Sequence, residues 1–426
     1  MKSLDAKLAE IKSNRPSRTF IIADAKDADM AFGVRAPGPR GYLARGGARR
    51  AQFSPEVWSR DEFGYRNLPE FLDIIREIAH QGIVDIMLMS AYVNEQLTIK
   101  EGLFRDSRVT PAARANDTTD VWAVRHGCYT REPSQPFRSA SIDQIQCGQV
   151  ECERAGDDFP GANLGLYSIT YVNELRQDRE ALLWYKQFRE EAERKNFRHF
   201  LEVFDSNVDS GIPPEKLGEF INDNILRTLA GVPDAGRPLF LKIVYHGPKA
   251  MEELAQYDSN LVVGILGGSA GTTYDAFRLI HDAQKYGARV ALFGRKINNS
   301  EHQLAFIEML RLITDGKLNP EEAVRAYHGV LQGKGMKPHR TLEEDLKLTD
   351  QTMSYDGNAN RRATSSPPAQ TINRRAAMVD QAYTAAKQPS PVTDWPKRGD
   401  GSPDFASMTS EHRRAYDAWR LTRKFG

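Results

Sequence analysis

Lys242 lies inside an apolar segment, PLFLKIVYHGP at 238–248, and no other residue of the sequence suggests chemistry as strongly. Such a run predicts a buried strand. An ammonium group is costly to bury without a partner and tends to lose its proton there. A deprotonated lysine attacks carbonyl carbons and forms a Schiff base with them. The segment therefore predicts a nucleophilic lysine at the end of a strand.

Polar residues interrupt other apolar runs in a similar way. Side chains alternate between the two faces of a strand, so Glu202, Asp24 and Tyr167 each have a defined face. If those faces point inward, the three groups converge on Lys242, where they could transfer protons. Tyr171 shares the face of Tyr167 and is the alternative phenol. An ordinary structural explanation stays open, because a strand lysine can extend to the rim and Glu202 can simply pair with it.

A glycine-rich turn and an arginine form a second group of candidates. ILGGSAGTTYDAF joins a strand to a helix, and FGRKIN follows the next strand. Backbone amides before a helix, together with a guanidinium, are suited to a phosphate. A tight turn would also need such glycines. The predicted phosphate-binding residues are Gly267, Gly268, Ser269, Ala270, Gly271, Gly294 and Arg295.

Short apolar runs alternate with helical patterns between Thr19 and Gln332, and this alternation predicts the fold. The expected strands are 19–25, 83–91, 120–126, 164–172, 199–205, 238–246, 261–268 and 288–295. The expected helices between them include 70–82, 180–197, 273–287 and 301–316. Strand–helix repeats indicate parallel strands, and about eight of them predict a (β/α)8 TIM barrel in the α/β class. A doubly wound open sheet is the alternative.

Other parts of the chain do not fit the repeat. We expect an N-terminal segment at 1–18, the barrel at 19–332 and a polar C-terminal extension at 333–426. An inserted loop is expected at 33–65, and its 33–50 part is rich in Gly, Pro and Arg. The extension is partly helical by its pattern and otherwise too polar to build a core. It is expected to be either a flexible tail or an oligomerisation arm.

Composition excludes several classes of protein. The 426 residues are 40% hydrophobic and carry a formal charge of +1, so charge does not indicate nucleic acid or membrane as a partner. The polar N-terminus is unlike a secretory signal, and no apolar stretch is long enough to span a bilayer. Three cysteines in no zinc or redox spacing predict reduced thiols and a cytoplasmic location. The histidines near strand ends, His126, His199 and His246, have no paired metal-ligand spacing, which disfavours a metal-dependent (class II) aldolase.

Three motifs, LKIVYHGPKAM, LGGSAGT and ALFGRKIN, resemble the class I aldolases of the DeoC/LacD/DhnA superfamily in order and spacing. LYSITYVNE and RHFLEVFD look most similar to its tagatose-bisphosphate branch, beside the fructose-bisphosphate enzymes. The resemblance implies a (β/α)8 barrel with Lys242 as the Schiff-base lysine and Glu202 as the acid of the fifth strand. It implies Asp24 as the aspartate of the first strand and Tyr167 for proton transfer. The first strand reads IIADAKDAD, and it lacks the DHG-like or DQ-like residues that the resemblance leads us to expect there.

The expected function is that of a class I aldolase, a carbon–carbon lyase that reversibly cleaves a phosphorylated ketose through a lysine Schiff base. The resemblance implies no cofactor, no metal, a sugar-phosphate substrate and a homo-oligomer. The alternative is a non-catalytic barrel that binds a partner through its Arg-rich loop and tail.

Overall fold

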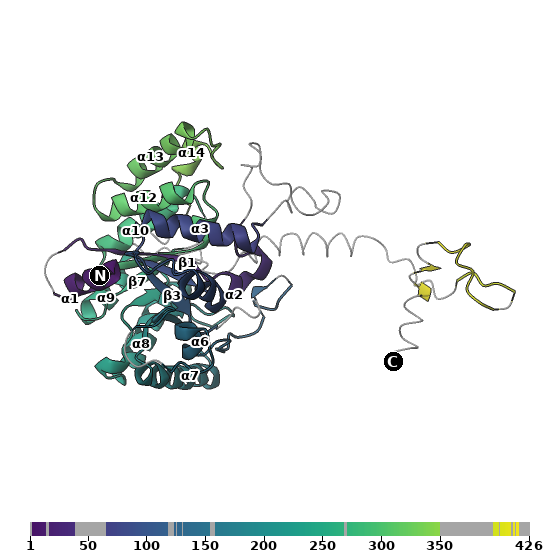
Figure 1. Ribbon diagram of the computed structural model, residues 1–426, viewed down its shortest axis with the longest axis horizontal. Helices are drawn as coiled ribbons and strands as arrows, with labels where there is room; N and C mark the ends of the chain where they lie inside the picture. The colour runs from purple at the N-terminus through teal and green to yellow at the C-terminus, as the bar shows by residue number, and fades with distance from the viewer. Residues whose placement is uncertain are drawn as a thin grey trace. The chain divides into compact units, whose positions relative to one another are not determined.

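Short parallel strands, each followed by a helix, close into a barrel in the computed structural model of the protein (Figure 1). The structure describes residues 2–13, 17–38, 65–117, 123–124, 126–129, 131–153, 158–267, 271–349, 395–399, 401–409, 412–413 and 415–416. The strands are β1 Ile21–Lys26, β2 Ile86–Met89, β3 Thr110–Arg114, β4 Leu164–Thr170, β5 Arg198–Phe204, β6 Leu241–Ile243, β7 Gly264–Gly267 and β8 Val290–Phe293. Consecutive strands pair, and β8 pairs with β1, which confirms the predicted TIM barrel.

The helices pack outside the strands. Those of the described residues are α1 Ser3–Lys12, α2 Asp29–Phe32, α3 Leu68–Gln81, α4 Ala91–Asn94, α6 Ile142–Cys147, α7 Leu175–Arg194, α8 Leu217–Ala230, α9 Pro248–Tyr257, α10 Thr273–Lys285, α11 Arg295–Asn298, α12 Gln303–Thr314, α13 Pro320–Gly333 and α14 Leu342–Asp345. Several begin at reciprocal caps, such as Asn67 with Glu70 before α3, because the cap satisfies amides that lack a helical partner. No helix in these ranges is long and apolar enough to cross a bilayer.

Successive side chains of a strand point to opposite faces of the sheet, and they form two apolar layers, one inside the barrel and one beneath the helices. Residues of one parity fill the barrel interior, where Phe200 stacks on Phe240 with ring centroids 4.5 Å apart. Residues of the other parity, such as Ile22 and Ile243, pack beneath the surrounding helices. A polar side chain in a strand therefore faces the interior or the helix layer according to its parity alone.

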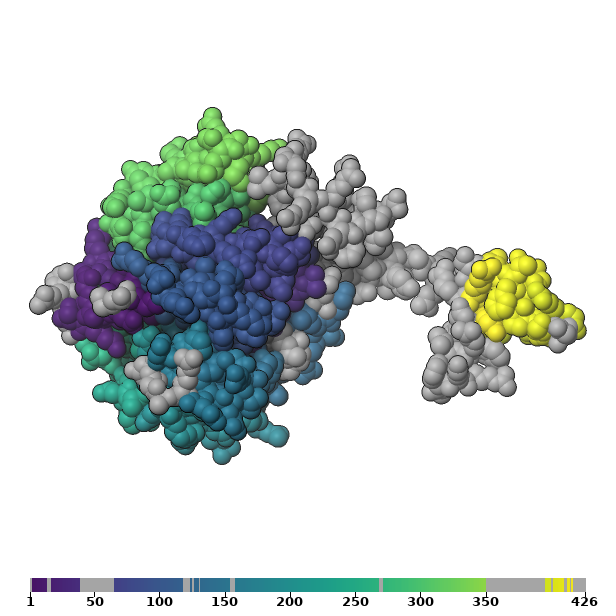
Figure 2. All heavy atoms as spheres, viewed as in Figure 1, coloured from purple at the N-terminus to yellow at the C-terminus, as the bar shows by residue number. Residues whose placement is uncertain are grey.

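The N-terminal helix α1 covers one end of the barrel. Its apolar side chains Leu4 and Leu8 belong to the interior cluster of the barrel. Lys7 on the same helix pairs with Asp85 just before β2, with 2.8 Å between Nζ and Oδ2. Figure 2 shows the purple N-terminal segment at the surface, where Leu4 and Leu8 of α1 close this end of the barrel. The opposite end of the barrel carries the carboxyl ends of the strands.

The predicted third strand at 120–126 is wrong. The strand is β3, which pairs with β2 and β4, whereas Ala123, Val124 and His126 lie in no strand. The positive φ of 68° at His126 does not fit a strand either. The segment TPAAR is short and contains a proline, so its pattern is weaker than that of DVWAVRH.

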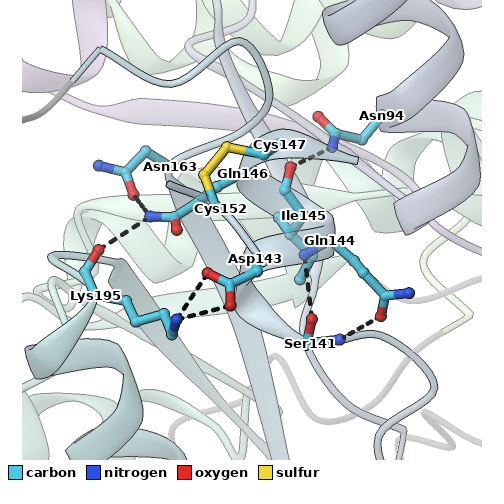
Figure 3. The surroundings of a disulfide bond; sticks show 10 residues. All are labelled: Asn94, Ser141, Asp143, Gln144, Ile145, Gln146, Cys147, Cys152, Asn163 and Lys195. Atoms are coloured by element: carbon cyan, nitrogen blue, oxygen red, sulfur yellow. Dashed lines mark hydrogen bonds and ion pairs between the residues drawn. A yellow bond between two sulfur atoms is a disulfide. The ribbon is translucent and has the colours of Figure 1, made fainter. Parts of the chain in front are cut away.

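Cys147 and Cys152 form a disulfide beside α6, and the prediction of reduced thiols is wrong for these residues (Figure 3). The chain turns back after α6 and brings the Cα atoms within 5.7 Å, inside the range of about 4.4–6.8 Å that a disulfide spans. Nearby, Asp143 pairs with Lys195 at 2.7 Å between Oδ2 and Nζ.

The chain divides into two units, Met1–Pro367 and Pro368–Gly426. In the first unit, α12 packs on α3, α10 and α13, and α14 follows α13 (Figure 1). In the second unit, Tyr416 lies edge-on to Trp395 and Phe405, with centroid distances of 5.3 and 5.2 Å. These rings give the described part of the extension a small aromatic cluster of its own.

Candidate functional site

Lys242 and Glu202 form an ion pair inside the barrel. The register of β5 with β6 places them side by side, and 2.5 Å separates Lys242 Nζ from Glu202 Oε1. The lysine side chain is 9% exposed and the glutamate 2%. Ser168 of β4 donates a hydrogen bond of 2.9 Å from its hydroxyl to the other oxygen of Glu202. The predicted meeting of lysine and carboxylate is confirmed, and a serine joins it from the fourth strand.

The pair lines a cavity of about 100 Å³ at the carboxyl end of the strands. Its wall is formed by residues of β1, β3, β5, β6, β7 and β8, by α2, and by residues that follow β1, β3 and β8. Its polar and glycine residues are Asp27, Arg114, Tyr129, Glu202, Lys242, Gly267, Gly294 and Arg295. Catalytic groups of this fold collect at this end of the barrel. The cavity therefore brings the candidate nucleophile and the candidate phosphate-binding arginine to one place.

The prediction that Asp24 points into this cavity is wrong. Asp24 shares its parity with Ile22, so it faces the helix layer, and the inward positions of β1 are Ala23 and Ala25. Its carboxylate pairs with Lys26, with 2.9 Å between Oδ2 and Nζ and no exposure of either side chain. Desolvation raises the pKa of Asp24 and lowers that of Lys26, in each case against the attraction of the partner.

Helices after β8 complete the surroundings of Lys26. Its ammonium donates to the amide oxygen of Asn298 in α11 and, over 3.3 Å, to that of Gln303 in α12. The ammonium thus donates to oxygens of Asp24, Asn298 and Gln303, and a buried ammonium requires such acceptors. This network ties α11 to β1 from behind the barrel wall.

The predictions for Tyr167 and Tyr171 are wrong in the same way. Both residues belong to the apolar layer beneath the helices. Tyr167 stacks on Phe188 of α7 with centroids 4.5 Å apart, and the hydroxyl of Tyr171 lies 2.7 Å from that of Thr228 in α8. Desolvation raises the pKa of Tyr167 far above its ordinary value and that of Tyr171 to about 12. These phenols pack the helices onto β4, whereas Ser168, of the opposite parity, faces the interior and contacts Glu202.

A buried arginine network was missed by reasoning from the sequence. Arg114 is 5% exposed at the end of β3 and pairs with Asp27, with 3.1 Å between Nη1 and Oδ2. Its Nε lies 3.4 Å from Oδ1 of Asp117. The misplaced third strand hid Arg114, and the choice of Asp24 hid Asp27, three residues further along. Tyr129, in the loop after β3, was missed for the same reason.

Two glycines of the predicted phosphate-binding set are required by packing. A Cβ on Gly267 would lie 2.1 Å from the ring of Phe293, and a Cβ on Gly294 would lie 2.8 Å from the backbone oxygen of Ala25. Arg295 lies beside them with its guanidinium 5.5 Å from the ring of Phe32. The structure thus brings together Gly267, Gly294 and Arg295 of the predicted set, with Gly271 at the start of the next turn. Gly268, Ser269 and Ala270 lie outside the described residues.

The histidines noted in the sequence have protein partners or lie apart. His199 is buried behind β5, where its Nε2 lies 2.9 Å from the hydroxyl of Tyr185, and desolvation lowers its pKa to about 3. His246 pairs with Asp205 at 2.9 Å between Nε2 and Oδ1. Within the described ranges, no group of three or more His, Cys, Asp or Glu side chains is arranged to hold a metal ion.

Comparison with known proteins finds similar solved structures. No protein-family model matches the chain, and no curated protein matches it. A crystal structure of an archaeal fructose 1,6-bisphosphate aldolase is 13% identical, covers 73% of this chain and 99% of its own, and gives a TM-score of 0.50. A fructose-bisphosphate aldolase from Slackia heliotrinireducens is 12% identical, covers 76% of this chain and 89% of its own, and gives a TM-score of 0.51. At these identities the likeness shows a shared fold, and it confirms the predicted resemblance at that level: the chain has the TIM-barrel fold of these fructose-bisphosphate aldolases.

Proposed function

We propose that the protein is a class I aldolase that reversibly cleaves a phosphorylated ketose through a Schiff base on Lys242. The observation that carries the proposal is the Lys242–Glu202 pair on the wall of a cavity that also contains Arg295. A lysine whose ammonium contacts a carboxylate can pass its proton to it and attack a carbonyl as the neutral amine. The aldolase neighbours share the fold, and their reaction is carried over here as part of the proposal.

The proposed steps use groups on the cavity wall. The amine of Lys242 adds to the ketone carbon, and water leaves after proton transfer from Glu202, which Ser168 orients. The resulting iminium accepts the electron pair of the bond between the α and β carbons as that bond breaks, and an enamine forms. The hydroxyl on the β carbon loses its proton to a base and becomes the carbonyl of the departing aldehyde, and we assign the carboxylate of Asp27, on the same wall, as this base. Protonation of the enamine and addition of water release the ketone and regenerate Lys242.

Borohydride trapping tests the nucleophile directly. The protein is incubated with dihydroxyacetone phosphate and sodium borohydride, which reduces an imine to a stable secondary amine. We expect loss of activity and an adduct on the peptide that contains Lys242. Lys242→Met should give no adduct, whereas Lys249→Met, which removes an exposed lysine of α9, should be trapped like the wild type.

The outcomes separate the proposal from its alternatives. An adduct spread over surface lysines, with full retro-aldol activity in Lys242→Met, would contradict the Schiff-base role. Turnover should survive EDTA, and a loss that zinc restores would indicate a metal-dependent aldolase instead. No turnover of any ketose phosphate, together with no adduct, would favour a barrel without this chemistry.

A further inference from the structure

A segment near the start of the C-terminal extension contacts the start of α10. This segment, Thr341–Thr349, includes α14 and forms hydrogen bonds with Thr272, Thr273 and Asp275. Asp345 Oδ1 accepts a hydrogen bond of 2.7 Å from the backbone amide of Thr273, and its Oδ2 lies 3.0 Å from Nε2 of His328. Asp345 is 4% exposed, so this contact is made in the protein interior.

Further bonds join the same two segments. The hydroxyl of Thr272 donates to the backbone oxygen of Lys347 over 2.8 Å, and the amide of Thr349 donates to Asp275 Oδ1 over 2.7 Å. The hydroxyl of Thr349 also bonds the carboxylate of Asp275. That carboxylate caps α10 by accepting from the amide of Thr272 over 2.8 Å.

These bonds use the donors that a helix start would otherwise offer to an anion. Free amides and the positive end of the helix dipole attract phosphate. Here the amides of Thr272 and Thr273 already donate to Asp275 and Asp345. A phosphate at this end of the barrel must therefore rely on Arg295 and on backbone nearer to β7 and β8. The segment holds the turn in place instead of leaving its helix amides to the ligand.

Lys296 connects this turn to the arginine. It follows Arg295 in α11, and its ammonium donates to the backbone oxygens of Gly271 and Thr272 over 3.0 and 2.8 Å. The position of the turn and the position of α11 are therefore coupled through one side chain. A continuous set of contacts runs from Asp345 through Thr273 and Thr272 to Lys296, beside Arg295.

We propose that Thr341–Thr349 is a positioning segment for the phosphate end of the site, with Asp345 as its principal residue. Resting on the proposed function, this assigns to the extension a part in binding the phosphate group of the substrate. Asp345 touches no substrate in this scheme. It holds Thr272 and Thr273 at the start of α10 and, through Lys296, the helix that carries Arg295.

The test compares substitutions within the segment. Asp345→Ala should raise the Kd for inorganic phosphate and the KM for a phosphorylated ketose by about tenfold, the usual scale for groups that orient a binding residue. The values of kcat and of kcat/KM for the unphosphorylated analogue should change by less than about twofold, since Lys242 and Glu202 are untouched. Asp345→Asn keeps an oxygen acceptor for the amide of Thr273 and should recover part of the affinity.

Two variants guard against misfolding and unspecific charge effects. Thr349→Val removes a single hydroxyl from an exposed residue and should shift the phosphate Kd in the same direction by a smaller factor. Glu343→Gln removes an exposed carboxylate from the same helix without breaking any of these bonds, and it should leave every value unchanged.

The results distinguish this inference from the proposed function. Equal losses for phosphorylated and unphosphorylated substrates, or an unchanged phosphate Kd in both Asp345→Ala and Thr349→Val, would overturn the positioning role. Binding of inorganic phosphate requires no chemistry, so it decides the inference even if Lys242 is never trapped. Trapping of Lys242 with unphosphorylated dihydroxyacetone decides the proposed function independently of the segment.

Discussion

Two buried lysine–carboxylate pairs lie on opposite faces of the same barrel wall. Lys26 and Asp24 face the helices, with both side chains fully buried and with amide oxygens of α11 and α12 around the ammonium. Lys242 and Glu202 face the interior and border a cavity. In the sequence both lysines look alike, as single cations within or next to an apolar run.

The difference lies in what surrounds the ammonium. Lys26 is fully buried and donates to oxygens of Asp24, Asn298 and Gln303, so a reacting molecule has no room to approach it. Lys242 has a carboxylate on one side and open space on another. A buried lysine is thus a candidate nucleophile only where a cavity adjoins it, and otherwise it is part of the packing.

Exchange of each lysine for methionine tests this comparison, and the largest expected difference between the two variants is in the rate of reaction. Lys242→Met should reduce retro-aldol activity by roughly a thousandfold or more, since covalent catalysis supplies several kcal/mol of transition-state stabilisation. The matched Lys26→Met protein should retain borohydride trapping and most of its kcat at a temperature where it is folded. Trapping that depends on Lys26 and not on Lys242 would reverse the assignment.

The same two variants should rank in the opposite order in stability. Lys26→Met leaves Asp24 buried without its cation, which typically costs about 3–5 kcal/mol in the free energy of unfolding. The double variant Asp24→Leu/Lys26→Met should recover much of that loss, because apolar replacements of a buried pair are often neutral. Urea unfolding of the single and double variants measures both effects. A Lys26→Met protein as stable as the wild type would show that the network contributes little.

Arg295 tests whether the cavity beside Lys242 binds the phosphate group of a substrate. Arg295→Ala should weaken a phosphorylated ketose by roughly ten- to a hundredfold relative to its unphosphorylated analogue, since a charge-assisted bond is worth about 1.5–3 kcal/mol. Arg295→Lys should recover only part, because an ammonium lacks the forked geometry of a guanidinium. Steady-state kcat/KM values for the matched substrates check this. Equal losses for both substrates would indicate a structural role for the arginine.

A third lysine gives the smallest expected effect. Desolvation lowers the pKa of Lys296 to about 8, from 10.5 for an exposed lysine. Between these values the unfolded chain holds a proton that the folded protein has released, so stability should rise with pH over this window. Lys296→Met should lack this part of the rise, which urea unfolding at several pH values measures. A curve with the same slope in wild type and variant would contradict the lowered pKa.

The barrel could be predicted from the sequence because strand and helix periods repeat along it. The Lys242–Glu202 contact could be predicted for a similar reason. The apolar segments around these two residues are long enough to show which side chains of each strand face inward. Asp24 could not be placed, because β1 carries polar groups at Asp24, Lys26 and Asp27 and the pattern does not say which parity faces inward. The small inward residues Ala23 and Ala25 give no hydrophobic signal strong enough to decide. Arg114 could not be predicted, because the hydrophobic pattern of β3 is weak. Only the pairing of β3 with β2 and β4 identifies it as the third strand.

The contact between the segment Thr341–Thr349 and α10 has a consequence for folding during synthesis. Thr349 bonds Asp275 across a sequence separation of 74 residues, and it follows all eight strands in the chain. The ribosome therefore releases every strand of the barrel before it releases the residues that hold the turn after β7. Contacts of long sequence separation are entropically costly to close and form late. We expect a nascent chain to form its barrel first and to reach its full affinity for phosphate only when the segment Thr341–Thr349 has docked.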